Sequence, residues 1–552
     1  MTTPLNYRKI IHCIGVSREY IILNTIVAAL MAVLLLILII VFLTLVVGVA
    51  RSAMSIYWLT PRRIKKAMER QGVCGPTPKF LVGNIPDMDA IFAMAKPKDS
   101  DVDSTISHDI VGHLLPHYLL WSKQFGKRFI FWIGREPRMC LTEINLIREL
   151  LMKHSTTAGR SWMQRQGTKH FIGEGLLMAN GADWHNQRHL VAPVFSGDKL
   201  KRYAQFMVEL TEKMMRDLES AVRGGQTELE IGQCMTQLTA DIISRFEFGS
   251  SHAKGKQIFH LLEVLQDRCA ESSRHFCFPG SRFFPSKYNR EISSLKMETE
   301  RLLMEIIQSR RESVEAVQDG NTSYGDDLLG MLLNEMHKKK VGGAGGSDFN
   351  VCLQLIMDEC KTFFFAGHET TAVLLAWTIM LLASNPSWQQ KVREEVVRVC
   401  GGQPIGTGHF PKLSLLSMVI NESMRLYPPA LILPRMALED IKLGDLFIPK
   451  GLSVWIPVLA FNHSEELWGE DADDFNPGRF SSESCSPGKF TPFAMGPRNC
   501  IGQSFAMIEA KIILAMLISR FSFTISENYR HAPVVVLTLK PKYGVQVCLK
   551  PL

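Results

Sequence analysis

The sequence lacks the cysteine patterns that hold structural metals or disulfide scaffolds. Its 12 cysteines are scattered over 552 residues, with no Cys-x-x-Cys pair and no zinc-type Cys/His spacing. Scattered cysteines of this kind are typical of reduced thiols in a domain that faces the cytosol, and they argue against a secreted, disulfide-rich protein. The sequence also has no internal repeat and no break long enough to divide residues 73–552 into two domains.

Excess charge is almost absent outside the N-terminal region. The formal net charge is +8, but residues 1–72 hold nine of the Lys and Arg side chains and only two acids. The remaining chain is therefore close to neutral. A near-neutral body gives no basis for nucleic-acid binding, which needs a dense set of cations to neutralise phosphates.

Long uncharged runs are also scarce, and one stands out. Residues 26–50 contain no charged side chain, and a helix of this length spans a hydrocarbon core of about 30 Å. A cleaved signal peptide is the alternative, but its apolar region is only about 7–15 residues long. Three Lys/Arg precede the run and six lie within residues 51–70. The positive-inside rule therefore predicts a single-pass anchor with the bulk of the protein on the cytoplasmic side.

The predicted organisation has four parts. Residues 1–25 form a short N-terminal segment, 26–50 a transmembrane anchor, 51–78 a basic flank with a Pro/Gly linker, and 79–552 a single large domain. Helical periodicity dominates residues 144–336, and a long helix is expected over residues 349–383. Short strands are expected at 129–133, 139–141 and 441–456. The predicted fold class is mainly α with small β-sheets (α+β).

Cys500 lies in a loop whose composition suits a metal-binding thiolate. The stretch Phe493-Ala-Met-Gly-Pro-Arg-Asn-Cys-Ile-Gly502 leads into an apolar helical pattern, and a helix N-terminus favours a thiolate over a thiol. Glycines at 496 and 502 leave room for a flat macrocycle, and Arg498 can pair with one of its carboxylates. These features suit a haem whose iron is bound by a thiolate that favours O–O cleavage. The alternative is a buried structural cysteine.

This stretch resembles the haem-binding signature of the cytochrome P450 monooxygenases, Phe-x-x-Gly-x-Arg-x-Cys-x-Gly. Every fixed position of the signature is matched, from Phe493 to Gly502. The resemblance covers about residues 55–552. It implies a cytochrome P450-type domain that binds haem b through the Cys500 thiolate, with Phe493 and Arg498 beside the cofactor.

A second motif, Ala366-Gly-His-Glu-Thr-Thr371, interrupts an apolar helical pattern. Gly367 lets a ligand approach the helix backbone, and the neighbouring Glu369 and Thr370 can relay protons. The alternative is a kink that the threonines stabilise by bonding to the preceding turn. The motif is similar to the family's Ala/Gly-Gly-x-Asp/Glu-Thr-Thr/Ser, which implies that Glu369 and Thr370 are its acid–alcohol pair over the distal haem face. His368 is expected to be a spacer or a substrate contact.

A third motif carries charge of both signs. Glu422 and Arg425 are three residues apart and share one helix face. They resemble the family's Glu-x-x-Arg motif, whose third member is an Arg in a later loop, here Arg479. The residue before Arg479 is Gly478, where the family commonly has an acid, so one secondary ion pair is expected to be missing. The implied role is structural support of the cysteine loop.

Further positions match the family one by one. Trp184 and Arg188 fit its Trp-x-x-x-Arg helix, and Arg435 fits its basic position after the Glu-x-x-Arg helix. The resemblance implies that Trp184, Arg188, Arg435 and Arg498 hold the two haem propionates. The alternative for any single one of these arginines is a solvated surface residue.

Some stretches are more similar to one branch, the plant cytokinin trans-hydroxylases. These stretches are residues 58–65, 278–282, 286–291, 363–370 and 529–552. The branch implies an N6-isopentenyl adenine nucleotide or nucleoside as substrate and a trans-zeatin-type product. Arg160, Arg165 and Lys169 are candidate partners for a substrate phosphate. The alternative is that all three are surface charges.

The leading functional hypothesis is a membrane-anchored haem-thiolate monooxygenase that uses O2. No flavin or nicotinamide domain is visible, so the electrons are expected from a separate NADPH–cytochrome P450 reductase. The expected location is the endoplasmic reticulum membrane, with the catalytic domain in the cytosol, and no nucleic acid is expected as a partner. One alternative is a monooxygenase of another plant terpenoid, steroid or hormone. A haem-thiolate lyase or isomerase, or a haem sensor or scaffold, is disfavoured by the Glu369-Thr370 pair.

Overall fold

The computed structural model describes residues 7–95, 106–249, 252–273, 286–315, 323–341, 346–481 and 489–552. The chain divides into two units, one that ends at Ala67 and one from Met68 to Leu552. The second unit therefore begins ten residues before the end of the expected linker at residue 78. The stretch 278–282, which contributed to the resemblance, lies outside the described residues.

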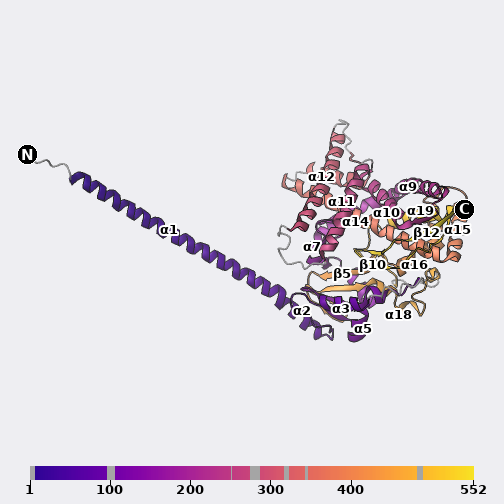
Figure 1. Cartoon of the computed structure of the whole chain (residues 1–552), viewed down its shortest axis with the longest axis horizontal. Helices are drawn as coiled ribbons and strands as arrows, with labels where there is room; N and C mark the ends of the chain where they lie inside the picture. The colour runs from indigo at the N-terminus through magenta and orange to yellow at the C-terminus, as the bar shows by residue number, and fades with distance from the viewer. Residues whose placement is uncertain are drawn as a thin grey trace, which may run out of the picture. The chain divides into compact units, whose positions relative to one another are not determined.

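The first unit consists of one long helix and its continuation. Helix α1 (Tyr7–Met54) runs through a π-helical turn (Ser55–Leu59) into α2 (Thr60–Glu69) (Figure 1). The predicted span 26–50 lies inside α1, and all of its side chains are exposed. Leu23–Glu69 is long and apolar enough to cross a membrane. Exposed apolar side chains over this length indicate a lipid environment, because water would penalise them.

A second segment, Cys352–Ser384, passes the same length and composition test. Its most apolar part is 78% buried inside the second unit, so it is a core helix of that unit. A helix that is apolar on all sides is buried either in lipid or in protein.

The second unit is built mainly from helices. They are α3 (Ile85–Ala95), α4 (Val111–Leu114), α5 (Pro116–Phe125), α6 (Ile144–Lys153), α7 (Trp162–Thr168), α8 (Gly181–Val191), α9 (Gly197–Arg223), α10 (Ile231–Phe248), α11 (His252–Ser273), α12 (Lys287–Glu315), α13 (Leu328–Val341), α14 (Gly346–Ser384), α15 (Pro386–Cys400), α16 (Ser414–Leu426), α17 (Val458–Asn462), α18 (Glu465–Trp468) and α19 (Gln503–Arg520). Short 3-10 turns span Ala192–Phe195, Phe410–Lys412 and Pro477–Phe480.

The strands form small sheets. One has the order β1-β2-β8-β5-β3 and another the order β4-β12-β9, and β6-β7 and β10-β11 are hairpins. Their bounds are β1 (Phe129–Ile133), β2 (Glu136–Cys140), β3 (Ala158–Gly159), β4 (Glu228–Glu230), β5 (Ile432–Ala437), β6 (Ile441–Leu443), β7 (Leu446–Ile448), β8 (Ser453–Pro457), β9 (Phe521–Ile525), β10 (Pro533–Val535), β11 (Leu539–Pro541) and β12 (Gln546–Pro551).

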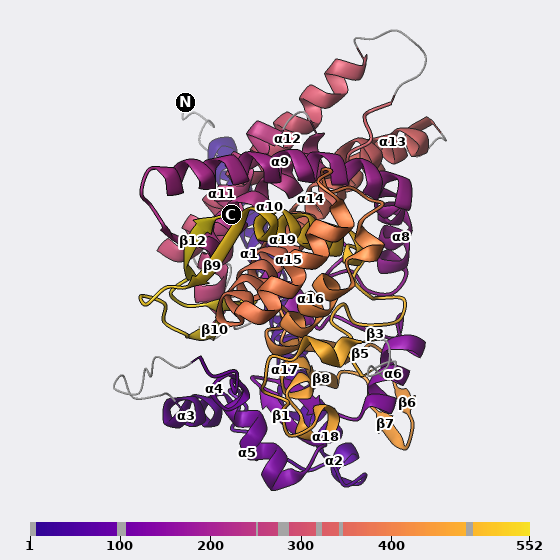
Figure 2. The same cartoon turned by 90° about the vertical axis from the view of Figure 1, so that its right-hand side faces the viewer.

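The sheet that contains β5 lies at one end of the second unit with α3, α5 and α18, and helices α9 to α14 lie at the other end (Figures 1 and 2). Helix α14 is the centre of the helical part, because α10, α13, α16 and α19 all pack against it. Trp377 of α14 is fully buried and stacks on Tyr427 with 4.3 Å between ring centroids. The predicted fold class, mainly α with small sheets, is confirmed.

Candidate functional site

The loop before α19 is bent tightly around Cys500. The Cys500 N–H donates to the Phe493 carbonyl (2.9 Å), and the Asn499 N–H donates to the Gly496 carbonyl (3.0 Å). Ala494 and Gly496 have positive φ angles of 57° and 75°, a conformation that L side chains rarely adopt. The loop thereby presents the Cys500 side chain, which is exposed, just before the first turn of α19.

The environment of Cys500 acts on its pKa in two directions. Desolvation by the surrounding protein raises the pKa of the Cys500 thiol, while the Gly502 N–H and the Arg188 charge oppose that rise. The net pKa lies above the ordinary value, so the protein alone favours the neutral thiol. A metal ion bound to the sulfur reverses this balance, because a coordinating thiol is deprotonated.

The two glycines of the loop differ in what surrounds them. A Cβ on Gly496 would lie 2.2 Å from the Leu151 carbonyl oxygen, so packing against the C-terminal part of α6 already requires glycine there. A Cβ on Gly502 would lie 4.0 Å from the Cys500 sulfur, which is an ordinary contact. The expectation that both glycines make room for a macrocycle therefore has a competing explanation at Gly496.

Helix α8 brings two predicted residues to this loop. Arg188 donates to the Asn499 carbonyl and to its side-chain oxygen, both at 2.8 Å. Trp184 is buried, and the Arg498 guanidinium carbon lies 4.3 Å from its ring centroid. Stacking on an aromatic face orients the planar Arg498 side chain. Residues that are more than 300 positions apart in the sequence thus meet beside Cys500.

Arg160, Arg435 and Arg498 form a cluster of positive charge. Burial lowers the pKa of Arg160 to about 10. Burial, followed by the charge of Arg160, lowers the pKa of Arg498 to about 10. Burial, followed by the charges of Arg160 and Arg498, lowers the pKa of Arg435 well below its ordinary value. The three side chains are therefore close enough to repel one another.

In the described part of the chain, the hydrogen-bond acceptors around this cluster are all uncharged carbonyl groups. Arg160 donates to Leu177 (3.0 Å), Arg435 to Pro434 (3.0 Å), and Arg498 to Ser155 (2.7 Å) and Ala179 (3.0 Å). Within the described ranges, no carboxylate forms an ion pair with any of the three arginines. Positive charge that is removed from water without a counter-charge is costly. The cluster is therefore suited to an anionic group from outside the chain.

The three candidate phosphate partners separate in the structure. Arg165 and Lys169 both pair with Glu174, at 3.6 and 3.5 Å, and both are more than a third exposed. Arg160 instead lies with Arg435 and Arg498, two of the predicted propionate partners. No local pattern predicts this grouping, because 275 positions separate Arg160 from Arg435.

One part of α14 is incompletely covered by protein. Between residues 356 and 383 the side chains are buried except at Phe365, Ala366, Gly367 and Thr370, which are half-buried. These four positions lie within two turns of one another around the predicted acid–alcohol motif. A local gap in the cover of a core helix is what a site for a ligand requires.

The hydroxyl groups of the motif bond to the preceding turn. Thr370 donates to the Ala366 carbonyl (2.7 Å) and Thr371 to the Gly367 carbonyl (3.1 Å), while α14 stays α-helical. A Cβ on Gly367 would lie 2.4 Å from the Ile243 Cδ1 atom, so close packing against α10 already accounts for this glycine. The backbone approach of a ligand at Gly367 stays a prediction.

Glu369 is buried and held by donors from distant parts of the chain. Its carboxylate accepts hydrogen bonds from Gln266 of α11 (2.6 Å) and Thr538 (2.7 Å), and it pairs with Lys540 of β11 (2.8 Å). Desolvation raises the pKa of Glu369, but Lys540, Thr538 and Gln266 together outweigh it and hold the pKa below its ordinary value. Glu369 is therefore an ionised carboxylate. These partners of Glu369 could not be predicted from the sequence, since no local pattern links them.

His368 has a different environment from Glu369. It is buried, stacks on Phe364 with 4.2 Å between ring centroids, and shares a 2.8 Å hydrogen bond with the Phe364 carbonyl. Its Nε2 atom lies 3.7 Å from a Glu263 carboxylate oxygen. These contacts favour the expectation that His368 is a spacer, since its two ring nitrogens already face protein groups.

Comparison with known proteins agrees with this geometry. A family model described as Cytochrome P450 matches residues 112–549. Two proteins of Arabidopsis thaliana, both named Cytokinin hydroxylase, are 64% and 62% identical to this chain over 93% of its length and 98% and 97% of theirs. Cytochrome P450 709B1 of the same plant is 37% identical over 93% of this chain and 98% of its own. The chain belongs to the cytochrome P450 family.

As a cytochrome P450, the protein binds haem b, with a cysteine thiolate as the ligand of the iron. It also requires a redox partner and acts on a small-molecule substrate. The residues described above fit that cofactor. The Cys500 sulfur is exposed on its loop and can bind the iron. The three arginines, which have no carboxylate partner in the described chain, can neutralise the two propionates. The half-buried part of α14 can contact a ligand.

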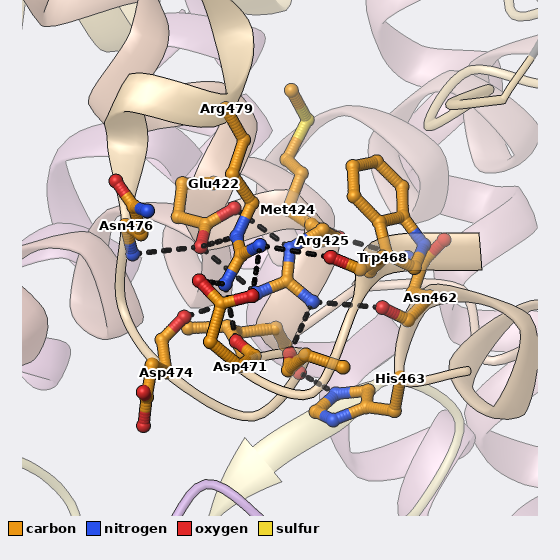
Figure 3. A network of polar contacts seen from close by, with 12 residues as sticks. Glu422, Met424, Arg425, Asn462, His463, Trp468, Asp471, Asp474, Asn476 and Arg479 are labelled. Atoms are coloured by element: carbon orange, nitrogen blue, oxygen red, sulfur yellow. Dashed lines mark hydrogen bonds and ion pairs between the residues drawn. The ribbon is translucent and has the colours of Figure 1, made fainter. Parts of the chain in front are cut away.

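In this cytochrome P450 the Glu-x-x-Arg motif is fully buried. Arg425 donates to both oxygens of Glu422 (2.7 and 2.8 Å) and to the carbonyls of Asn462, Ala472 and Asp474 (Figure 3). Arg479 approaches Glu422 to 3.5 Å and pairs with Asp471 at 2.7 Å. Asp471 thus supplies a carboxylate for Arg479 where Gly478 supplies none, and the clamp keeps a second ion pair.

Proposed function

We propose that this cytochrome P450 hydroxylates the prenyl side chain of N6-isopentenyl adenine cytokinins at the trans methyl group. The observation that carries the proposal is identity of 62–64% over nearly the full length of two relatives named Cytokinin hydroxylase. The overall reaction inserts one oxygen atom of O2 into a C–H bond and releases the other as water. The two electrons come from NADPH through a separate reductase.

Each predicted site residue receives a role in this proposal. Cys500 is the thiolate ligand of the haem iron, and Phe493 supports it through the carbonyl that accepts the Cys500 N–H. Trp184, Arg188, Arg435 and Arg498 hold the haem propionates, as the resemblance implied. Arg160 joins them in place of its expected contact with a substrate phosphate, because its position beside Arg435 and Arg498 supports that role.

When bound, haem b supplies the iron that activates O2. Thr370 holds a proton at Oγ1 on the uncovered part of α14, and its hydroxyl must turn away from the Ala366 carbonyl to donate that proton. Glu369 is the neighbouring proton relay; its donors keep it ionised at rest, so it holds a proton only while passing it on, and Lys540, which is one-third exposed, links its carboxylate to solvent. Phe365 and Gly367 are half-buried in the same part of α14, and we assign Phe365 the exclusion of water and Gly367 the approach of a ligand to the helix backbone on the side that Ile243 does not cover.

We place the protein in the endoplasmic reticulum membrane, with α1 as its single span and the catalytic domain in the cytosol. The exposed apolar side chains of α1 and the excess of Lys and Arg after the span support this placement. The reductase is then an NADPH–cytochrome P450 reductase of the same membrane.

The test is product formation in microsomes that carry the chain and a reductase. Isopentenyl adenine nucleotides and the corresponding nucleoside should both be offered, and the trans-hydroxylated product should appear only with NADPH. Cys500→Ser should abolish both the product and the thiolate signature in the reduced carbon monoxide spectrum, whereas Cys74→Ser, at an exposed cysteine, should keep both. A normal spectrum without product would overturn the cytokinin assignment and leave the family activity intact.

Thr370 has a separate test. Thr370→Ala should keep haem binding but divert NADPH electrons to hydrogen peroxide, because the proton donor is lost. Thr371→Ala is the matched control, since Thr371 is buried and bonds to the same turn of α14. Unchanged coupling between NADPH consumption and product in Thr370→Ala would remove Thr370 from its proposed role.

A further inference from the structure

The segment 171–179, between α7 and α8, is bound to α14 through its backbone. Asp358 accepts the Glu174 N–H (2.9 Å), and the two carboxylate oxygens of Glu359 both accept the Leu176 N–H (3.1 Å each). The Thr362 hydroxyl, one turn further along α14, donates a hydrogen bond to the Ile172 carbonyl oxygen (3.4 Å). Three successive parts of the segment are therefore fixed by one face of α14.

Two glycines allow this close approach. A Cβ on Gly173, which has a φ angle of 75°, would lie 2.2 Å from the Asp358 carboxyl carbon. A Cβ on Gly175 would lie 2.4 Å from the Thr362 hydroxyl oxygen and 2.8 Å from the Asp358 carbonyl oxygen. Side chains at these positions would push the segment away from α14. The carboxylates and the glycines thus form one matched contact.

The segment carries groups that belong to the site at both of its ends. The Phe171 ring lies edge-on to Phe365, with 5.6 Å between centroids, and Phe365 is one of the four half-buried positions of α14. The Leu177 and Ala179 carbonyls accept hydrogen bonds from Arg160 and Arg498. A shift of the segment would therefore move the aromatic pair first, since the arginine end is held separately by these two side chains.

We propose that Asp358 and Glu359 are positioning residues that fix segment 171–179 on α14 and thereby set the size of ligand that fits beside Phe171 and Phe365. The proposal rests on the haem-thiolate site proposed above. Neither carboxylate belongs to the half-buried positions of α14, because both are buried and their oxygens accept N–H groups of the segment. Their effect on ligands is therefore exerted through the backbone of the segment.

Asp358 and Glu359 differ in their ion-pair partners, and this difference determines which of them is better substituted in a test. Asp358 pairs with the buried Lys361 (2.7 Å), so its removal would also leave a cation uncompensated. Glu359 has no ion-pair partner among the residues that the structure describes. Burial raises the pKa of Glu359 to about 8, opposed by the Leu176 N–H, so Glu359→Gln is a close mimic of its neutral form. Glu359→Leu removes both acceptor oxygens.

The control comes from the same group of charges. Glu300 of α12 contacts Lys361 (3.2 Å) and lies near Gln354, but no backbone N–H of segment 171–179 is among its partners. Glu300→Gln therefore removes a carboxylate from the group without removing an acceptor from the segment. If these charged residues only stabilised the fold, Glu300→Gln and Glu359→Leu would have the same effect on ligand binding.

The experiment is spectral titration of the haem-loaded full chain with imidazole and with 4-phenylimidazole. Imidazole is small and stays close to the iron that it binds. The phenyl ring of 4-phenylimidazole extends further, into the surrounding site. Glu359→Leu should change the Kd for 4-phenylimidazole by about tenfold or more, because the released segment alters the space beside Phe171 and Phe365. The Kd for imidazole should stay within about twofold, and Glu359→Gln and Glu300→Gln should resemble the wild type for both ligands.

Hydrogen exchange of the segment is the second readout. Peptides that cover residues 171–179 should lose protection in Glu359→Leu and keep it in Glu300→Gln. Gly173→Ala is a second variant in case Glu359→Leu does not fold, and it should give the same selective effect, because it displaces the segment but keeps both carboxylates. Equal changes for both ligands, or no change with either segment variant, would overturn the proposal. A wild type that gives no imidazole spectrum would instead overturn the haem site itself, and the proposal with it.

Discussion

Two sets of arginines in this protein differ in how their charge is balanced. Arg425 is fully buried, and its guanidinium is saturated by the Glu422 carboxylate and three carbonyls. Arg160, Arg435 and Arg498 are desolvated too, but carbonyl oxygens are the acceptors found for them in the described chain. The first set is complete by itself, whereas the second set lacks an anion.

This difference separates a structural role from a binding role. A buried ion pair that satisfies all of its donors fixes the segments that supply its partners, here α16, the α17–α18 region and the loop up to Arg479 (Figure 3). A group of like charges opposes folding until a ligand neutralises it. The same side chain type therefore supports the fold in one place and is available to an anion in the other, where we propose that it holds the haem propionates.

The largest expected effect is at the balanced set. Glu422→Ala leaves Arg425 buried without its carboxylate, and breaking a buried pair in this way costs about 3–5 kcal/mol. We expect the urea midpoint of the detergent-solubilised full chain to fall accordingly, with little folded protein recovered. Asp471→Asn is the control, because Asp471 is 47% exposed and an exposed pair contributes under about 1 kcal/mol. Similar losses in both variants would contradict the comparison.

For the arginine set that lacks an anion, we expect one substitution to act in opposite directions on the haem-free and the haem-loaded protein. Arg435→Met removes a repelled charge, so the haem-free protein should be no less stable than the wild type. The same variant should release haem about tenfold faster or more, since a charge-assisted hydrogen bond to a propionate is lost. Haem transfer to an acceptor globin measures the release. Arg301→Met, at an exposed arginine of α12, should change neither quantity; a haem-free form destabilised by Arg435→Met would refute the comparison.

Glu359 is a buried acid, and its burial has a consequence for stability as a function of pH. Its pKa rises from 4.5 to about 8 because burial disfavours the charged form. The folded protein therefore binds a proton at this site that the unfolded chain releases, and the stability contributed by that proton is lost as the pH rises from about 4.5 to about 8. Thermal midpoints of the wild type should fall relative to Glu359→Gln over this range. Parallel curves for the two proteins would show that Glu359 titrates normally.

The smallest effect is expected at an exposed pair. Lys127 and Glu466 lie 2.6 Å apart, but their side chains are 63% and 68% exposed. Lys127→Ala should change the unfolding free energy by less than about 1 kcal/mol, because solvent screens the pair. Chemical denaturation checks this value. A loss comparable with that of Glu422→Ala would mean that distance, and not burial, governs these pairs.

Much of the candidate site could be proposed from the sequence because its residues lie in short motifs. The Cys500 loop, the Glu369-Thr370 pair and the Glu422/Arg425 spacing each occupy fewer than eleven residues, so local spacing carries the information. The anchor at 26–50 was equally local, since length and lack of charge suffice to predict a span. The mainly helical fold followed from apolar periodicity, although β2 begins three residues earlier than predicted, at Glu136.

Partners from distant segments could not be predicted in this way. Arg160, and not Arg165, joined the cluster with Arg435 and Arg498, and Lys540 and Gln266 met at Glu369. Each pairing depends on the path of the chain between its members. The fixing of segment 171–179 by α14 is of the same kind, with more than 180 residues between partners.

The sequence by itself determined the membrane span, the fold class and the residue types that a haem-thiolate site needs, because all three depend on composition and short-range spacing. The tertiary structure decided which charges are neutralised and which stay open to a ligand. Charge balance depends on distance and burial in three dimensions, and neither is encoded in the spacing of residues along one segment.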